Sequence, residues 1–182
     1  MPLTLLLGGA RSGKSSLAVR MAASNGSPVV FIATAEPRDE EMRARILEHR
    51  AQRPPGWELV EEPVALEEAL VDLPPETCAV VDCLTLWVAN LVEHGSSDQE
   101  IRDRASAAAA LASGRMGRTI AVTNEVGSGI VPVNPLARRY RDLLGSVNAL
   151  WAEAADTALL VIAGRVLILA EVPAPRQVPA DG

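Results

Sequence analysis

Aromatic side chains, cysteine and long apolar runs are all scarce in this sequence of 182 residues. Aromatic residues make up only 3% of the chain, so aliphatic side chains must fill the core. The two cysteines, Cys78 and Cys83, match no metal-site spacing and cannot make a disulfide framework, so we expect two reduced, buried thiols. No apolar run approaches the roughly 20 residues that a membrane-spanning helix needs. We therefore expect no membrane span.

Positive charge is scarce as well. The formal net charge is -6, which argues against broad electrostatic binding to nucleic acid or to an anionic membrane. With 48% hydrophobic and 22% charged residues, the composition is that of an ordinary globular protein, and the length indicates one domain. The start, Met1–Leu7, lacks a basic leader and is typical of a first strand, so we expect a cytoplasmic protein.

Short apolar runs alternate with longer charged or alanine-rich stretches. This alternation predicts an α/β fold in which a mainly parallel sheet is flanked by helices. The expected strands are Leu3–Leu7, Trp57–Glu61, Val29–Ala33, Cys78–Asp82, Thr119–Thr123, Ala158–Ile162 and Val166–Ala170, most of them buried. The expected helices are Lys14–Ala23, Asp39–Gln52, Val64–Val71, Leu84–Glu93, Asp98–Ala112 and Pro135–Ala154.

The C-terminal part of the chain departs from this alternation. Gly164 and Arg165 lie between the last two strands, and this gap is too short for a helical crossover, so these strands should form an antiparallel hairpin. The final ten residues contain three prolines. We therefore expect one domain over residues 1–172 and a loose tail over 173–182.

The most specific local motif is a phosphate-binding loop. It has the pattern G-x-x-x-x-G-K-S and consists of Gly8, Gly9, Ala10, Arg11, Ser12, Gly13, Lys14 and Ser15. An expected strand precedes it and an expected helix begins at Lys14, which is the context that this motif requires. Backbone N–H groups and the helix N-terminus would hold phosphate oxygens. Lys14 would reach the β- and γ-phosphates of ATP or GTP, and the Ser15 hydroxyl would bind Mg²⁺.

Asp82 closes the apolar run Ala79–Val81. An apolar run that is closed by Asp at the end of a parallel strand forms a Walker B pattern, in which the carboxylate holds Mg²⁺ directly or through water. Ligands of open parallel sheets bind at this edge. The structural alternative is that Asp82 caps the following helix.

The expected helix Asp39–Gln52 carries a histidine among basic residues. Helical spacing places Met42, Ile46 and His49 on one face, and Arg50 and Arg53 follow. On pattern alone a solvated surface helix is the simpler interpretation. The catalytic alternative is that neutral imidazole attacks phosphorus while nearby arginines stabilise the charge in transfer. The second histidine, His94, lies at an expected helix end, where a capping or surface role is expected.

Together these segments resemble the bifunctional adenosylcobinamide kinase / adenosylcobinamide-phosphate guanylyltransferase family of cobalamin biosynthesis. The likeness runs from about Leu3 to Leu169, and its specific parts are the histidine helix and the run Thr123–Pro132. The other matching pieces are residues 8–15, Ile32–Thr34, Asp39–Met42, Arg45, Arg53, Pro54, Trp57, Asp82–Trp87, Asn90, Leu136–Arg138, Tyr140–Asp142, Gly145, Asn148 and Ala155–Asp156.

The resemblance implies two reactions and a set of site residues. A nucleoside triphosphate phosphorylates adenosylcobinamide, and GTP then transfers GMP to this phosphate through a guanylylated histidine, here His49. The implied nucleotide contacts beyond the phosphate loop are Ala33, Thr34, Ala35, Arg50, Ala51, Gln52, Arg53, Glu61 and Asp82. The resemblance also implies a homotrimer. Glu125, at the end of an expected strand, could face the same edge or simply cap a turn.

Two other functions stay open at this stage. The chain could be a small-molecule kinase with a merely structural His49, or a non-catalytic nucleotide switch. An Asn-Lys-x-Asp guanine motif, which would favour a switch, is not recognisable. The sequence does not distinguish ATP from GTP as the donor for the kinase reaction.

Overall fold

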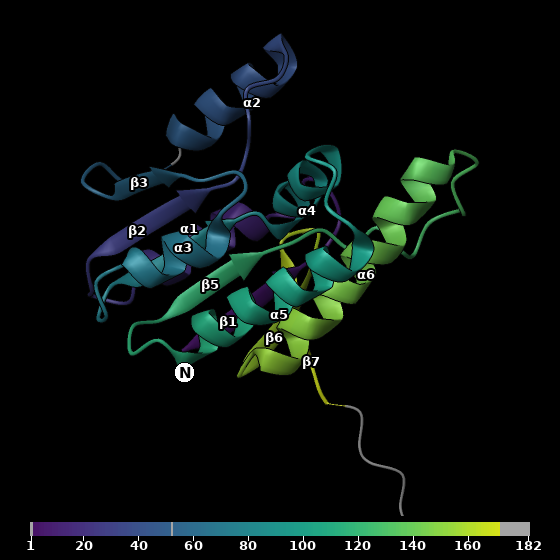
Figure 1. Ribbon diagram of the computed structural model, residues 1–182. Coiled ribbons are helices and arrows are strands. Elements are labelled where there is room, and N and C mark those ends of the chain that lie inside the picture. Colours follow the sequence, from purple (N-terminus) through teal and green to yellow (C-terminus); the bar gives the residue numbers. More distant parts are fainter. Residues whose placement is uncertain (1, 52, 172–182) are drawn as a thin grey trace, which may run out of the picture.

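A computed structural model describes residues 2–51 and 53–171 of the chain (Figure 1). The expected tail over 173–182 lies outside these residues. The strands are β1 (Leu3–Leu7), β2 (Val29–Ala33), β3 (Glu58–Glu61), β4 (Cys78–Asp82), β5 (Thr119–Val122), β6 (Thr157–Ile162) and β7 (Arg165–Leu169). The helices are α1 (Lys14–Ala23), α2 (Glu40–Ala51), α3 (Leu66–Asp72), α4 (Leu84–Glu93), α5 (Asp98–Gly114) and α6 (Pro135–Ala154).

The seven strands form one sheet in the order β3-β2-β4-β5-β1-β6-β7. All neighbouring pairs are parallel except β6 and β7, which pair antiparallel as the short connection predicted. The expected α/β fold is therefore confirmed. The hairpin turn consists of Ala163 and Gly164, one residue earlier than expected, because Arg165 already pairs with Ile162.

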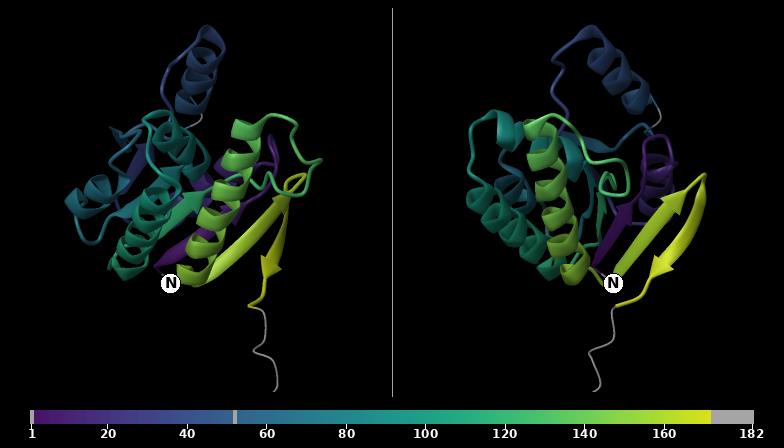
Figure 2. Two further views of the ribbon diagram at one scale, coloured as in Figure 1. Left: turned by 45° about the vertical axis from the view of Figure 1, so that its right-hand side comes forward. Right: turned by 90° about the vertical axis from the view of Figure 1, so that its right-hand side faces the viewer.

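Each strand places alternate side chains on opposite faces of the sheet, and both faces are buried in β1, β2 and β5. On one face Leu3, Leu5 and their neighbours pack against α3, α4, α5 and α6. On the other face Leu6 and Phe31 belong to a second apolar cluster, which contains residues of α1. Figure 2 shows the resulting layers, with most helices on one side of the sheet. Helices on both faces leave the carboxyl ends of the strands as the open edge.

Two elements are poorly covered by the rest of the protein. None of the described side chains of α2 is buried, and Figures 1 and 2 show this helix standing away from the layers. Strand β7 is exposed along its whole length although its sequence, Arg-Val-Leu-Ile-Leu, is apolar. It is therefore not the buried strand that its composition suggests.

The two thiols are free, as expected, but only Cys78 is fully buried while Cys83 is partly exposed. Within residues 2–51 and 53–171, no helix combines the length and the apolar character needed to cross a bilayer.

Candidate functional site

The phosphate loop connects β1 to α1, as its sequence predicted. Gly8 has no room for a side chain, because a Cβ atom there would overlap the carbonyl oxygen of Val161 in β6. The N-cap residue of α1 is Gly13, which has no side chain, so no side-chain cap occupies the backbone N–H groups of the first turn. Both features fit a loop whose backbone approaches phosphate oxygens.

Lys14 lies folded over this loop. Its Nζ atom donates to the carbonyl oxygens of Gly8 (2.9 Å) and Gly9 (2.7 Å), and it contacts Ser12 Oγ at 3.4 Å. Only 6% of Lys14 is exposed. Burial lowers the pKa of the amine, and the negative charge of Asp82 opposes this shift. Asp82 is thus within electrostatic reach of the phosphate loop, although β5 separates β4 from β1 in the sheet.

Three of the predicted contact residues share one row at the carboxyl edge of the sheet. Ala33 pairs with Glu61 on one side and with Asp82 on the other. Thr34, the next residue along β2, donates its N–H to the Asp82 carbonyl oxygen at 3.2 Å, and Ala35 follows it half-buried. Because parallel strands end at the same edge, residues distant in sequence meet here.

His49 of α2 lies beside this row. Its Nδ1 atom is 3.8 Å from Oδ2 of Asp82, an ion-pair distance rather than a hydrogen bond. The Asp82 side chain is 11% exposed and that of His49 is 39% exposed. The nearby Asp82 carboxylate raises the pKa of His49, and partial burial and Arg53 oppose this shift. The helix that seemed most like a solvated surface helix therefore brings its histidine to the Walker B carboxylate.

Asp82 does not cap the next helix. The N-cap position of α4 is Cys83, and no side chain caps it. The helix-cap alternative for Asp82 is therefore wrong, and the carboxylate is free to face the open edge.

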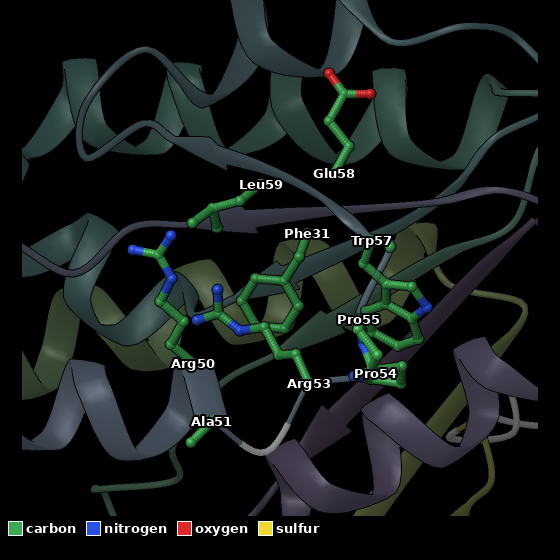
Figure 3. A pocket seen from close by; sticks show the side chains of 10 residues that line it. Phe31, Arg50, Ala51, Arg53, Pro54, Pro55, Trp57, Glu58 and Leu59 are labelled. Atoms are coloured by element: carbon green, nitrogen blue, oxygen red, sulfur yellow. The ribbon is translucent and has the colours of Figure 1, made fainter.

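Arg50, Ala51 and Arg53 line a pocket of about 430 Å³ between the end of α2 and strands β2 and β3 (Figure 3). The Arg53 guanidinium carbon lies 3.8 Å from the centroid of the Phe31 ring. The remaining lining residues are Pro54, Pro55, Gly56, Trp57, Glu58 and Leu59. None of them belongs to the phosphate loop, so the predicted nucleotide contacts divide between the loop edge and this pocket. Gln52 lies outside the described residues.

Two further candidates have local roles. The Glu125 carboxylate accepts from the backbone N–H groups of Gly127 (2.8 Å) and Ser128 (3.2 Å), as expected for a turn cap. His94 is the C-cap residue of α4, and its Nδ1 lies 2.8 Å from the Asn90 carbonyl oxygen. Neither side chain needs a catalytic explanation.

Sequence reasoning missed the contact between the hairpin turn and the phosphate loop. The Gly164 N–H donates to the Ser12 carbonyl oxygen at 2.9 Å. It also missed Phe31 as a pocket wall, since this residue lies within an apolar strand like any core residue. Nothing in the sequence indicates that Gly8 and Gly164 lie against neighbouring backbone. These close approaches follow only from the arrangement of the strands.

Mg²⁺ is the metal that the loop motif implies. Hard oxygen donors are available, because Ser15 lies in the first turn of α1 and the Asp82 carboxylate lies largely buried at the end of its strand. Among the described residues no cluster of three or more His, Cys, Asp or Glu side chains could hold a metal by itself. This donor set fits Mg²⁺ held jointly with nucleotide phosphates, rather than a transition metal in a protein cage.

A loop of this sequence between the first strand and its helix, a buried lysine, and an acidic strand end define a P-loop nucleotide-binding protein. Solved structures agree on the fold. The RadB recombinase has a TM-score of 0.51 at 16% identity, covering 87% of this chain and 73% of that chain.

Sequence relatives define the family. The model described as "Cobinamide kinase / cobinamide phosphate guanyltransferase" matches residues 4–169, and this chain belongs to that family. The "Bifunctional adenosylcobalamin biosynthesis protein CobP" of Pseudomonas aeruginosa is 45% identical over 162 residues, covering 88% of this chain and 92% of that protein. The "Bifunctional adenosylcobalamin biosynthesis protein CobU" of Escherichia coli is 37% identical over 175 residues, covering 89% of this chain and 96% of that protein.

Proposed function

We propose that this chain carries out two successive reactions on adenosylcobinamide. In the first, a nucleoside triphosphate, ATP or GTP, phosphorylates the hydroxyl of the aminopropanol arm. In the second, GTP transfers GMP to the new phosphate, giving adenosylcobinamide-GDP and pyrophosphate. One observation carries the proposal: in a chain of this family, the Nδ1 atom of His49 lies 3.8 Å from the carboxylate of Asp82, the residue that ends the Walker B strand.

The phosphate loop would serve the kinase reaction. The acceptor hydroxyl oxygen attacks the γ-phosphorus, and the bond to the nucleoside diphosphate breaks. Lys14 and the backbone N–H groups of the loop would hold the β- and γ-phosphates in place. Ser15 and Asp82 would hold Mg²⁺, which neutralises phosphate charge when bound.

His49 would serve the transfer reaction. With Nδ1 facing Asp82, the Nε2 atom is left to attack the α-phosphorus of GTP. A phosphorus–nitrogen bond forms while the bond to pyrophosphate breaks. A phosphate oxygen of adenosylcobinamide phosphate then attacks the same phosphorus and releases the imidazole. The covalent relay divides one difficult displacement into two easier ones.

The nucleotide would lie between the two groups of predicted contacts. Ala33 ends strand β2 and Thr34 and Ala35 follow it, while Glu61 ends the neighbouring strand β3. Arg50, Ala51, Gln52 and Arg53 belong to the end of α2 and the segment after it, and the two arginines supply positive charge for a triphosphate.

The proposal also includes self-association and a cellular compartment. The family resemblance suggests a homotrimer, and the exposed apolar strand β7 supplies a surface that a second copy could cover. A reaction that consumes GTP and a biosynthetic intermediate belongs in the cytoplasm.

Labelling with GTP tests the transfer chemistry directly. Protein incubated with Mg²⁺ and GTP labelled at the α-phosphate should acquire a covalent label, whereas GTP labelled at the γ-phosphate should leave none. A phosphorus–nitrogen bond makes the label acid-labile and stable to alkali. Because trypsin cuts after Arg45 and Arg50, the label should lie on the five-residue peptide Ile46–Arg50, whose only histidine is His49.

The chain offers matched controls. His49→Ala should abolish the label, while His94→Ala should retain it. Lys14 is the only lysine in the sequence, so a label on a lysine would have to lie on a different tryptic peptide. If the wild-type protein phosphorylates adenosylcobinamide but never acquires the label, the transferase half of the proposal is wrong and the chain is a plain kinase.

A further inference from the structure

The buried side chain of Asn90 connects two loops at the open edge of the sheet, the one between β2 and α2 and the one between β3 and α3. It lies on α4, the helix that follows the Walker B strand, and is only 3% exposed. Its Nδ2 atom donates to the carbonyl oxygens of Thr34 (2.8 Å) and Pro63 (2.9 Å). Its Oδ1 atom accepts from the Arg38 guanidinium at 2.7 Å. Only an amide supplies two N–H donors and one acceptor from a single short side chain.

Each of these bonds reaches a segment that carries a predicted contact residue. Thr34 is itself one, and its hydroxyl bonds both to the carbonyl oxygen (2.7 Å) and to the N–H (2.9 Å) of Cys83, the residue after Asp82. Pro63 lies two residues beyond Glu61. Arg38 lies two residues before α2, the helix that carries His49. The strand ends and the histidine helix therefore share one buried hydrogen-bonding centre.

The position of α2 depends strongly on its two ends. Because none of its described side chains is buried, core packing does not hold this helix against the sheet. At its C-terminal end, Arg53 lies over the Phe31 ring. At its N-terminal end, Arg38 bonds to Asn90 and also pairs with Glu36 and Glu93. Of these three partners of Arg38, Asn90 is the one that is buried.

From these contacts we infer that Asn90 is a positioning residue for guanylyl transfer. It places the start of α2 through Arg38 and the end of β2 through Thr34, so that His49 meets the α-phosphorus in line. The side chain of Asn90 bonds to Thr34, Pro63 and Arg38, none of which belongs to the phosphate loop. Its loss should therefore impair transfer much more than the kinase reaction, whose loop is held by β1, α1 and the hairpin turn. This inference rests on the proposed function.

The test compares the two reactions in the same variants. Asn90→Asp keeps an acceptor for Arg38 but faces the Thr34 and Pro63 carbonyl oxygens without a donor. Asn90→Leu removes all three bonds. We expect the single-turnover rate of His49 guanylylation to fall about 10- to 100-fold, as for a nucleophile displaced by about 1 Å. The kcat of the kinase reaction should stay within about threefold of wild type.

Two further variants separate positioning from general stability. Asn148 is a buried asparagine of α6 that bonds to Thr123 (2.7 Å) and to the Asn124 carbonyl oxygen (3.0 Å), away from α2. Asn148→Leu should lower both activities alike or neither, leaving their ratio unchanged. Arg38→Met leaves the core intact, so it tests the link to α2 even if Asn90→Leu does not fold. This variant should lower the rate of guanylyl transfer but not that of the kinase reaction.

The outcomes are distinct. If Asn90→Asp and Arg38→Met keep the wild-type ratio of transfer to kinase rates, Asn90 does not position the histidine and this inference fails. If wild-type protein never becomes guanylylated, the proposed function fails first. A ratio that falls for the Asn90 and Arg38 variants, but not for Asn148→Leu, supports the inference.

Discussion

His49 shows how strongly the chemical role of a single side chain depends on its neighbours in the fold. In the sequence it is one polar residue of a highly charged helix. In the fold it faces a carboxylate on a strand that lies 33 residues away along the chain, counted from His49 to Asp82. That neighbour can hold the ring in one orientation, with Nδ1 toward Asp82 and Nε2 toward the open edge.

The same neighbour sets the proton affinity of the imidazole. We expect NMR titration of the nucleotide-free and Mg²⁺-free protein to give a pKa for His49 above its ordinary value of 6.5, because the Asp82 carboxylate stabilises the protonated ring. The carboxylate–imidazolium attraction stabilises the fold fully at pH values below 6.5, and this contribution is lost as the pH rises through the raised pKa. Neutral, nucleophilic imidazole accordingly becomes dominant only above that raised value.

Two substitutions test whether the Asp82 carboxylate is what raises the pKa of His49. Asp82→Asn should lower the His49 titration midpoint, whereas Glu48→Gln should lower it less, because Glu48 is the weakest of the charges that raise this pKa. An unchanged midpoint in Asp82→Asn would show that Asp82 does not control the ring.

Among the elements, the β6–β7 hairpin has a connection of only two residues, Ala163 and Gly164. Both turn residues have positive φ, 49° at Ala163 and 73° at Gly164. A two-residue turn of this kind matches the twist of the paired strands, and it favours Asn-Gly. Alanine is strained in the left-handed region, while asparagine adopts it more readily. The turn also touches the phosphate loop through Gly164 and Ser12, so its geometry supports the site.

We therefore expect Ala163→Asn to increase the free energy of unfolding by about 1 kcal/mol. Urea denaturation should show a higher midpoint with an unchanged slope. Ala163→Val is the matched control: a β-branched residue tolerates positive φ poorly, so this variant should unfold at a lower urea concentration. A midpoint in Ala163→Asn at or below that of wild type would contradict the assigned turn geometry.

At the scale of the whole molecule, the sheet is covered unevenly. One face carries four helices and the other packs against α1, and the sheet extends through β6 to the exposed edge strand β7. Ile168 of β7 is 78% exposed and Leu167 is 60% exposed. An apolar edge strand left open in water is a site for pairing or association.

If β7 mediates self-association, the wild-type protein should have a solution mass near three times the monomer mass of 19.2 kDa. Light scattering after size exclusion should show this mass fall for Ile168→Glu, because a buried unpaired carboxylate would oppose the interface. Met116→Glu changes an equally exposed apolar residue, 77% exposed before β5, and should leave the mass unchanged. A monomeric wild-type protein would contradict self-association altogether.

Much of the fold was predictable because its signals are local. β1, β2, β4, α1, α4 and α6 have the bounds that their apolar runs and helical patterns indicated. The phosphate loop could be identified because glycine, lysine and serine at fixed spacing specify one backbone path. Asp82 could be identified in the same way, because it closes an apolar run that is typical of a buried strand.

The sequence by itself determined the nucleotide-binding class, the alternation of strands and helices, and the residues that could carry chemistry. Only the tertiary structure decided which of these residues meet. It placed His49 beside Asp82, made Glu125 a turn cap, left β7 exposed, and gave Asn90 bonds to two separate loops. The reason is physical: chain-local preferences fix a residue's conformation, whereas its partners depend on strand order and register, which bring distant segments to one edge.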